Sequence, residues 1–155
     1  MRTYILYEWK TKRYLIILFS LLAVSFLSGN VTFGADTEVR LSPYEMDLFH
    51  RINQYRVRHG SNPLKPDNML QGLARNHSRH MSGENSLSHD AFHERFEKCG
   101  RSHCVENVGW NSPTPDDQLS AWKKSEGHNT NLLNRKIRFA GISKVGAFVT
   151  FFACD

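Results

Sequence analysis

Two histidines and two glutamates are the main candidates for metal binding or proton transfer in this sequence. In chain order they are His89, Glu106, Glu126 and His128, and each lies next to an expected turn or strand end. Neutral imidazole nitrogens bind Zn²⁺ well, and carboxylates orient such ligands or act on a metal-bound water. No HExxH spacing places two ligands on one helix face, so the spacing alone also fits ordinary surface and capping groups. A shared site requires a fold that gathers these side chains.

The other six of the eight histidines have simpler interpretations. His77 falls on the apolar stripe of an expected helix, which favours a core position over a ligand. His80 lies on the same helix, and His93 with Glu94 is expected on a solvated helix face. Three further histidines are expected at the surface: His50, His59 and His103.

One arginine and two tryptophans near these groups are given structural roles. Arg95 is expected to fix a loop through an ion pair rather than to bind a substrate. Trp110 and Trp122 are expected to anchor the core, because large aromatic side chains supply much of the apolar area that a fold buries.

The first helix expected in the chain has strong capping and stop signals. Ser42 and Glu45 form a capping box with Pro43 at the first helical position, and Gly60 supplies a stop. They predict a helix over 43–59. Its inner face is expected to hold five residues: Met46, Phe49, Ile52, Asn53 and Arg56.

Further helices are expected along the chain. Asp67 caps a helix over about 68–81, and a turn is expected at 83–86. A short helix is expected over 91–96. Thr114, followed by proline and two acids, starts another helix that ends near Ser125.

Three apolar runs are typical of strands. Residues 105–110 alternate loosely, and residues 138–145 and 147–152 form a predicted antiparallel hairpin with Gly146 in the link. Three or four helices with about three antiparallel strands predict an α+β fold. The expected architecture is a three-layer α-β-α sandwich around a small antiparallel sheet.

The three cysteines leave several pairings open. A bridge between Cys99 and Cys104 would close a short loop, whereas a bridge from Cys154 to either of them is equally permitted. An exported chain permits such disulfides. No CxxC spacing occurs, so metal binding through these cysteines is not favoured.

The first 35 residues are predicted to be a signal peptide, which leaves one domain over 36–155. Basic residues precede the uncharged run Tyr14–Leu27, which is short for a membrane span of about 20 residues. Cleavage is expected after Gly34, and no cysteine follows the run to accept a lipid anchor. The alternative is an uncleaved anchor helix extended by Val31 and Phe33. The domain would lie outside the cell in both cases.

The charge of the chain depends strongly on this segment. The formal net charge of the whole chain is +5, but the first 35 residues hold four of the 20 basic and one of the 15 acidic side chains. The remaining part carries +2. This charge predicts no nucleic-acid partner. Membrane contact is expected only through the N-terminal segment, if it is uncleaved.

A series of short motifs from about Phe49 to Phe152 resembles the CAP superfamily, the cysteine-rich secretory, antigen 5 and pathogenesis-related 1 proteins, also called the SCP domain. Each fragment is short, and their shared order carries the resemblance. The form SxGHxxNLL is similar to the bacterial-type branch. The matching segments include Ile52-Asn53-Gln54-Tyr55-Arg56, Leu73-Ala74, Ser88-His89, Glu106-Asn107-Val108, Gly127-His128, Asn131-Leu132-Leu133 and Ala140-Gly141-Ile142.

The resemblance implies an α-β-α fold with a cleft that carries two His and two Glu and holds a divalent metal, often zinc. His89 matches the first His, Glu106 the first Glu and His128 the second His. The family's second Glu lies three residues after the tryptophan, where this chain has Ser125. Glu126, one position further on, either takes over that role or points to solvent.

Two functions follow from this resemblance. The first is a secreted or cell-surface, non-enzymatic module that binds a ligand, a lipid or sterol, or a cell-surface partner. The second is a metal-dependent peptidase or esterase, with Glu106 or Glu126 as the general base. No GxSxG or HExxH motif appears, and two protein ligands are fewer than the three usual in catalytic zinc sites. The non-enzymatic reading is therefore favoured.

Overall fold

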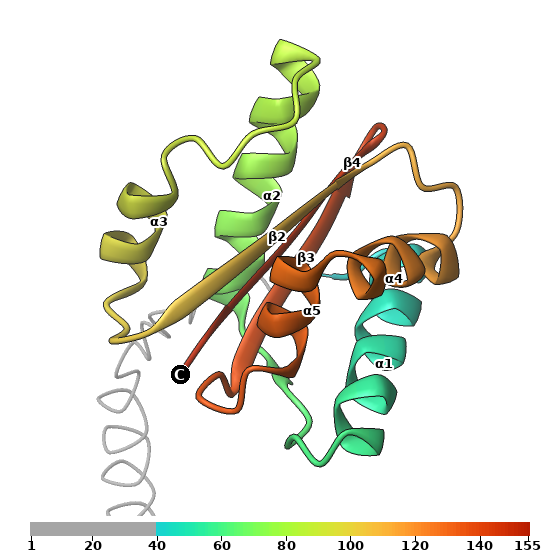
Figure 1. The fold of residues 1–155 in the computed structure, drawn as a ribbon. Helices are drawn as coiled ribbons and strands as arrows, with labels where there is room; N and C mark the ends of the chain where they lie inside the picture. Colours follow the sequence, from blue (N-terminus) through green and yellow to red (C-terminus); the bar gives the residue numbers. More distant parts are fainter. Residues whose placement is uncertain (1–39) are drawn as a thin grey trace, which may run out of the picture. The chain divides into compact units, whose positions relative to one another are not determined.

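The structure, a computed structural model, describes residues 40–155. This part of the chain forms a four-stranded sheet with helices on both faces (Figure 1). The predicted signal peptide and its cleavage site lie outside the described residues. The elements are α1 (Pro43–Arg58), β1 (Lys65–Pro66), α2 (Asn68–Glu84), α3 (Phe92–Cys99), β2 (Cys104–Trp110), α4 (Pro115–Lys124), α5 (Glu126–Leu133), β3 (Phe139–Val145) and β4 (Phe148–Cys154).

The strand order is β1-β3-β4-β2, so β2 is an edge strand and β4 lies between two partners. The predicted hairpin is confirmed as β3 and β4, which pair antiparallel, and β4 also pairs antiparallel with β2. The short β1 pairs parallel with β3, and the sequence indicated only an extended segment there. Every residue of β4 is buried, as expected for a central strand.

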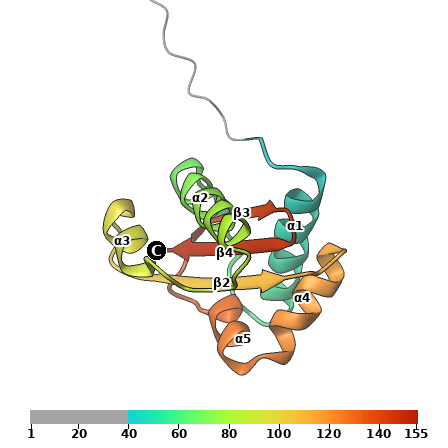
Figure 2. The ribbon, with the colours of Figure 1, turned by 90° about the horizontal axis from the view of Figure 1, so that it is seen from above.

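Alternation along β4 divides the core between the two faces of the sheet. Val149, Phe151 and Ala153 pack with apolar side chains of α1, α4 and α5. Phe152 and Cys154 pack with α2 and α3 on the opposite face, because successive strand side chains point to opposite sides. Figure 1 shows α2 and α3 on one side of the strands and α1, α4 and α5 on the other, and Figure 2 shows α4 and α5 next to β2. The predicted α-β-α sandwich is therefore confirmed.

The helix α1 begins as predicted, but its buried face differs from the expected one. Ser42 Oγ accepts a hydrogen bond from the Glu45 backbone N–H, and the Ser42 N–H donates to the Glu45 carboxylate. The expectation for Met46 was wrong, since it is 53% exposed. The buried positions are Glu45, Leu48, Ile52 and Arg56.

Arg56 is fully buried and contacts the end of α5, and within residues 40–155 it has no carboxylate partner. Its guanidinium donates to the backbone carbonyls of Asn62, Leu132 and Asn134. Burial lowers the pKa of Arg56. This side chain therefore ties α1 to the segment that carries His128.

Close approach between α2 and β3 depends on Gly141. A Cβ atom at this position would collide with the backbone of Leu70 and Gln71. The Gln71 side chain accepts from the Ile142 N–H at 2.7 Å and donates to the Ile142 carbonyl. The helix backbone and the strand thus meet without an intervening side chain.

Three other expectations need correction or completion. Trp110 is 57% exposed at the end of β2, so its assignment to the core was wrong, whereas Trp122 is buried as expected. The sequence did not predict α5 as a helix. The cysteine pairing left open is a Cys104–Cys154 disulfide, and Cys99 is free.

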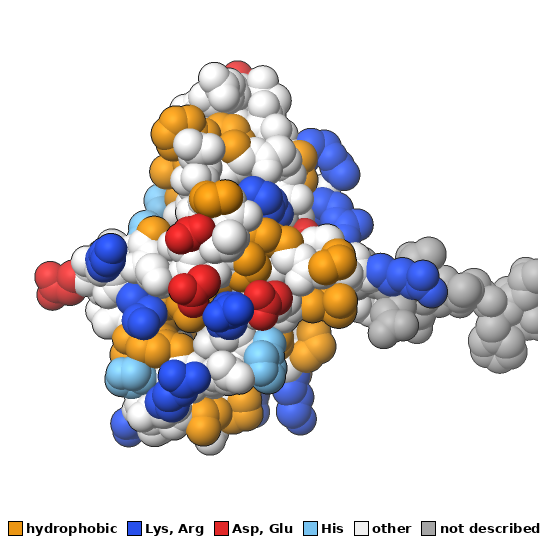
Figure 3. Space-filling model, turned by 90° about the vertical axis from the view of Figure 1, so that its right-hand side faces the viewer, with side chains coloured by type: hydrophobic (Ala, Val, Ile, Leu, Met, Phe, Trp, Pro, Cys, Tyr) orange, Lys and Arg blue, Asp and Glu red, His pale blue; other side chains and the backbone are white. Residues whose placement is uncertain are grey.

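Charged side chains are mixed in sign on the face shown in Figure 3. Basic and acidic groups are interspersed there, and no large block of one sign is visible. Among residues 40–155, no helix is long and apolar enough to cross a membrane.

Candidate functional site

The candidate residues line a cleft at the outer side of the edge strand β2. Its volume is about 550 Å³. His89 comes from the loop between α2 and α3, Glu106 from β2 and His128 from α5, so the cleft joins the two helical layers across the sheet edge. The lining residues are His89, Glu106, Ser125, Glu126, Gly127, His128, Thr130 and Asn131. The structure thus brings together all four side chains that the sequence singled out.

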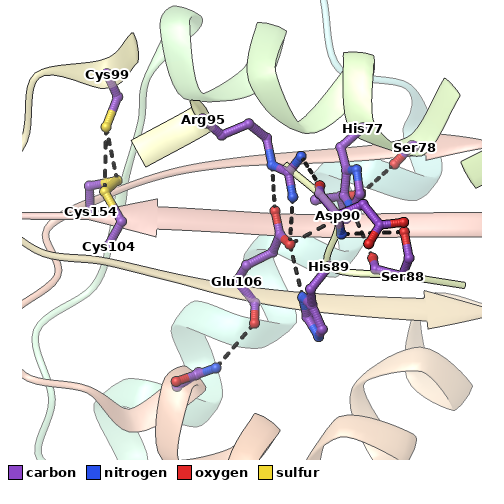
Figure 4. A network of polar contacts seen from close by, with 12 residues as sticks. His77, Ser78, Ser88, His89, Asp90, Arg95, Cys99, Cys104, Glu106 and Cys154 are labelled. Carbon is purple, nitrogen blue, oxygen red and sulfur yellow. Dashed lines mark hydrogen bonds and ion pairs between the residues drawn. A yellow bond between two sulfur atoms is a disulfide. The ribbon is translucent and has the colours of Figure 1, made fainter. Parts of the chain in front are cut away.

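The Glu106 carboxylate is the most constrained group of this cleft (Figure 4). Its side chain is 1% exposed. The Arg95 Nε donates to Oε2 at 2.8 Å, and Nη2 donates to Oε1 at 2.9 Å. The His89 Nδ1 also lies 2.9 Å from Oε1. Both carboxylate oxygens are therefore occupied by protein donors.

These partners determine the charge state of Glu106. Burial alone would raise its pKa, but the hydrogen bonds from His89 and Arg95 and the positive charge of Arg95 outweigh burial. The pKa of Glu106 is therefore lowered, and the carboxylate is ionised at neutral pH.

The ionised carboxylate fixes the tautomer of His89. A carboxylate only accepts hydrogen bonds, so the His89 Nδ1 carries the proton and donates it to Glu106. In this tautomer the Nε2 atom carries the lone pair of the ring. The His89 side chain is 52% exposed, which leaves the ring accessible from solvent. This is the carboxylate–histidine arrangement that orients metal ligands in proteins.

His128 lies in the first turn of α5, and a hydrogen bond from β2 fixes its backbone. The Asn107 amide donates to the His128 backbone carbonyl at 3.0 Å, and the Asn131 amide donates to Asn107 Oδ1 at 2.9 Å. Burial, and then the nearby His89, lower the pKa of His128. A neutral imidazole at this position is in the form that binds a metal.

Glu126 and Ser125, the two candidates for the second acid position, both line the cleft. Glu126 is exposed. Within residues 40–155, its carboxylate makes no hydrogen bond or ion pair, so it remains available to a ligand or a water molecule.

His77 occupies the core behind the cleft, as its position on the apolar stripe predicted. It is 2% exposed, and its Nε2 lies 2.8 Å from the Ser88 carbonyl and 3.7 Å from Glu106 Oε1. Burial lowers the pKa of His77 more than Glu106 raises it, so the ring is neutral. Ser88 directly precedes His89, and the His77 bond therefore helps to position the loop of the site.

Arg95 is the site residue whose role the sequence did not reveal in full. It was expected to fix a loop by an ion pair, and its Nη1 donates to the Asp90 carbonyl at 2.7 Å. Its ion pair with Glu106 was not predicted, because eleven positions of sequence and a change of element separate the two. Asn131 was likewise noted only as part of a motif.

Comparisons with known proteins identify relatives of this arrangement. The family model described as the cysteine-rich secretory protein family, CAP, matches residues 49–155. An uncharacterized protein of Bacillus subtilis, YkwD, is 30% identical over 123 residues, which cover 75% of this chain and 47% of the relative. The chain therefore spans about half the length of the curated relative it matches.

Solved structures show the same fold. An extracellular protein with an SCP domain from Bacillus anthracis is 25% identical with a TM-score of 0.68, over 74% of this chain and 44% of the other. An outer surface protein from Borrelia burgdorferi is 16% identical with a TM-score of 0.68, over 75% of this chain and 96% of the other. The second likeness concerns the fold alone.

Proposed function

The chain belongs to the CAP family of cysteine-rich secretory proteins, and on that premise we propose that it is an extracellular, non-enzymatic binding module whose cleft holds a divalent metal. The hydrogen bond from His89 Nδ1 to the buried Glu106 carboxylate is the observation that supports the proposal most strongly. It keeps the proton on Nδ1 and orients the ring, so that the lone pair of Nε2 is free to bind a metal. The similar structure from Bacillus anthracis is described as an extracellular protein, which supports the location.

The donor set of the cleft fits Zn²⁺. The imidazole rings of His89 and His128 line one hollow, and the lowered pKa of His128 favours its unprotonated ring. The two rings would hold the metal, and Glu106 would orient His89 without binding the ion itself. A bound Zn²⁺ would supply Lewis acidity and two or more open coordination positions.

Binding is favoured over catalysis because of how Glu106 is engaged. Arg95 and His89 occupy both oxygens of Glu106, which makes it a poor general base. Two imidazoles are also fewer protein ligands than the three found in most catalytic zinc sites. The open positions would therefore be filled by a ligand that the module recognises.

The lining of the cleft favours a polar or anionic ligand. Among the described residues that line it, none has an aliphatic or aromatic hydrocarbon side chain. Carboxylate or phosphate groups would bind to a metal and accept a hydrogen bond from the Thr130 hydroxyl, which lines the same cleft. A lipid or sterol, expected from the resemblance, would need an apolar surface, and its uptake stays a prediction.

One observation favours the hydrolase as a second candidate. The Glu126 carboxylate lines the same cleft and has no partner within residues 40–155. It is placed to accept a proton from a water molecule, which Glu106 is not. Metal-stimulated turnover of peptide or ester substrates that is lost in Glu126→Gln would support this candidate.

Calorimetric titration of the purified protein with Zn²⁺ tests the proposed metal site. We expect one equivalent to bind, and His128→Ala or His89→Ala to abolish binding while the circular dichroism spectrum is unchanged. His93→Ala is the matched control, because this exposed histidine lies on α3 and pairs with Glu97. Equal zinc affinity in the wild type and His128→Ala would remove the proposal.

A further inference from the structure

The three cysteines of the chain converge at one point of the fold, at the opposite end of β2 from Trp110 (Figure 4). The disulfide joins Cys104, the first residue of β2, to Cys154, which lies opposite it in β4. The free Cys99 closes α3, and its Sγ lies 3.4 Å from Cys104 Sγ and 3.8 Å from Cys154 Sγ. All three sulfur atoms lie within 4.8 Å of one another.

The surroundings hold the third sulfur against the bridge. Cys99 is 7% exposed, and its thiol donates to the Phe96 carbonyl at 3.0 Å. Leu70, Ala74 and Phe152 pack around this group. A small apolar side chain would fill the same space, so packing alone does not account for a thiol directed at two other sulfurs.

We propose that, when the Cys104–Cys154 bridge is reduced, the three sulfurs form a binding site for a thiophilic metal ion, Zn²⁺ or Cu(I). Thiolates are the ligands that these ions prefer. Four tetrahedral ligands at a Zn–S distance of about 2.3 Å place their sulfur atoms roughly 3.8 Å apart. The distance of 3.8 Å from Cys99 Sγ to Cys154 Sγ matches that spacing, and the distance of 3.4 Å to Cys104 Sγ is somewhat shorter. Three protein ligands would leave the fourth position to water.

The reaction that opens the site is a thiol–disulfide exchange with a dithiol. The dithiol transfers two electrons and two protons to the bridge, which becomes two thiols, and is itself oxidised to a disulfide. The metal then displaces three protons from Cys99, Cys104 and Cys154 as three metal–sulfur bonds form. In the oxidised chain only Cys99 offers a thiol, so the site exists in one redox state.

A reductant can reach the bridge from the solvent. Cys104 is half-buried, whereas Cys154 is fully buried. Cys104 lines a hollow of about 320 Å³. His89 and Glu106 line the same hollow, so the sulfur site lies next to the metal cleft but differs from it in donor type.

Titration with Co²⁺ distinguishes the two sites, because only thiolate ligands give an intense sulfur-to-cobalt charge-transfer band in the near ultraviolet. The protein is reduced with dithiothreitol, which is then removed under nitrogen, and is compared with the untreated protein. We expect the band to saturate at one equivalent in the reduced protein and to be absent from the oxidised one.

Two variants complete the test. Cys99→Ser should weaken the affinity of the reduced protein at least tenfold, whereas His128→Ala should leave the band unchanged. The wild-type comparison of reduced and oxidised protein remains decisive if Cys99→Ser fails to fold. A reduced wild type without the band, or a folded Cys99→Ser with wild-type affinity, would overturn the proposal. Neither outcome depends on zinc binding by His89 and His128.

Discussion

Arg95 and Glu106 form a two-point ion pair in which each carboxylate oxygen accepts from a different guanidinium nitrogen, at 2.8 and 2.9 Å. Both side chains are buried, at 9% and 1% exposure. The pair joins α3 to β2 and orients the carboxylate that accepts a hydrogen bond from His89. The orientation of His89 in the cleft therefore depends on a buried ion pair that lies behind the cleft surface.

Removing the arginine leaves a buried charge without a partner. Arg95→Met should destabilise the protein by about 3–5 kcal/mol at neutral pH, as measured by urea unfolding. Arg51→Gln is the matched control, because its pairs with Asp47 and Asp116 are exposed and such pairs contribute about 1 kcal/mol or less. An equal decrease in the free energy of unfolding in the two variants would show that the buried ion pair contributes no more to stability than an exposed one.

Stability should fall in two steps on acidification. The pKa of His77 is lowered in the fold, so below its ordinary value of 6.5 the unfolded chain binds a proton first and stability is lost. His128 acts in the same window. The pKa of Glu106 is also lowered, so its contribution is present above 4.5 and is lost as the pH falls through the folded pKa.

Urea unfolding between neutral and acidic pH measures both steps. In His77→Gln the slope of the unfolding free energy just below pH 6.5 should be smaller than in the wild type, because one of the responsible groups is gone. The lower step should remain, since Glu106 is intact. An unchanged slope in His77→Gln would contradict the neutral state assigned to the ring.

The orienting role of Glu106 predicts a measurable effect on metal affinity. Glu106→Gln should weaken Zn²⁺ binding by about 10–100-fold in calorimetry, because the neutral amide no longer fixes the His89 ring as strongly. Glu97→Gln is the control, because this exposed carboxylate lies on α3 and pairs with His93. Equal zinc affinity in the two variants would contradict the role of Glu106 in orienting His89.

The contact of α2 with β3 predicts opposite effects for two glycine substitutions. Gly141→Ala should destabilise by about 1–3 kcal/mol or more, because the added methyl group meets the backbone of Leu70 and Gln71. Gly83→Ala, near the end of α2 with open space around it, should be neutral or stabilising by up to about 1 kcal/mol. Chemical denaturation compares the two midpoints, and a tolerated Gly141→Ala would mean that α2 can shift.

The elements with local signals were predicted well from the sequence. The capping box at Ser42 and the Thr114–Pro115 start each precede the helix that was expected. By contrast, α5 carries few apolar residues and no regular stripe, so periodicity gave no indication of a helix there. Its stability comes from tertiary contacts, such as Asn107 with the His128 carbonyl.

The site was predictable only through the ordered motifs. Spacing alone did not join His89 to His128, because they lie in opposite layers of the sandwich. The ion pair of Arg95 with Glu106 and the buried face of α1 depend on how helices and strands pack against one another. Local sequence patterns within single segments do not specify this packing. Trp110 shows the same limit, since its place at the end of an edge strand exposes it.

The edge position of β2 has a consequence for self-association. The Asn131 amide donates to the Glu106 carbonyl, and the Trp122 indole donates to the Val108 carbonyl at 2.9 Å. Carbonyls already engaged in this way are poor templates for an incoming strand, and strand addition is a common route to fibres and swapped dimers. At high protein concentration, the edge of the sheet beside the cleft is thereby protected against polymerisation.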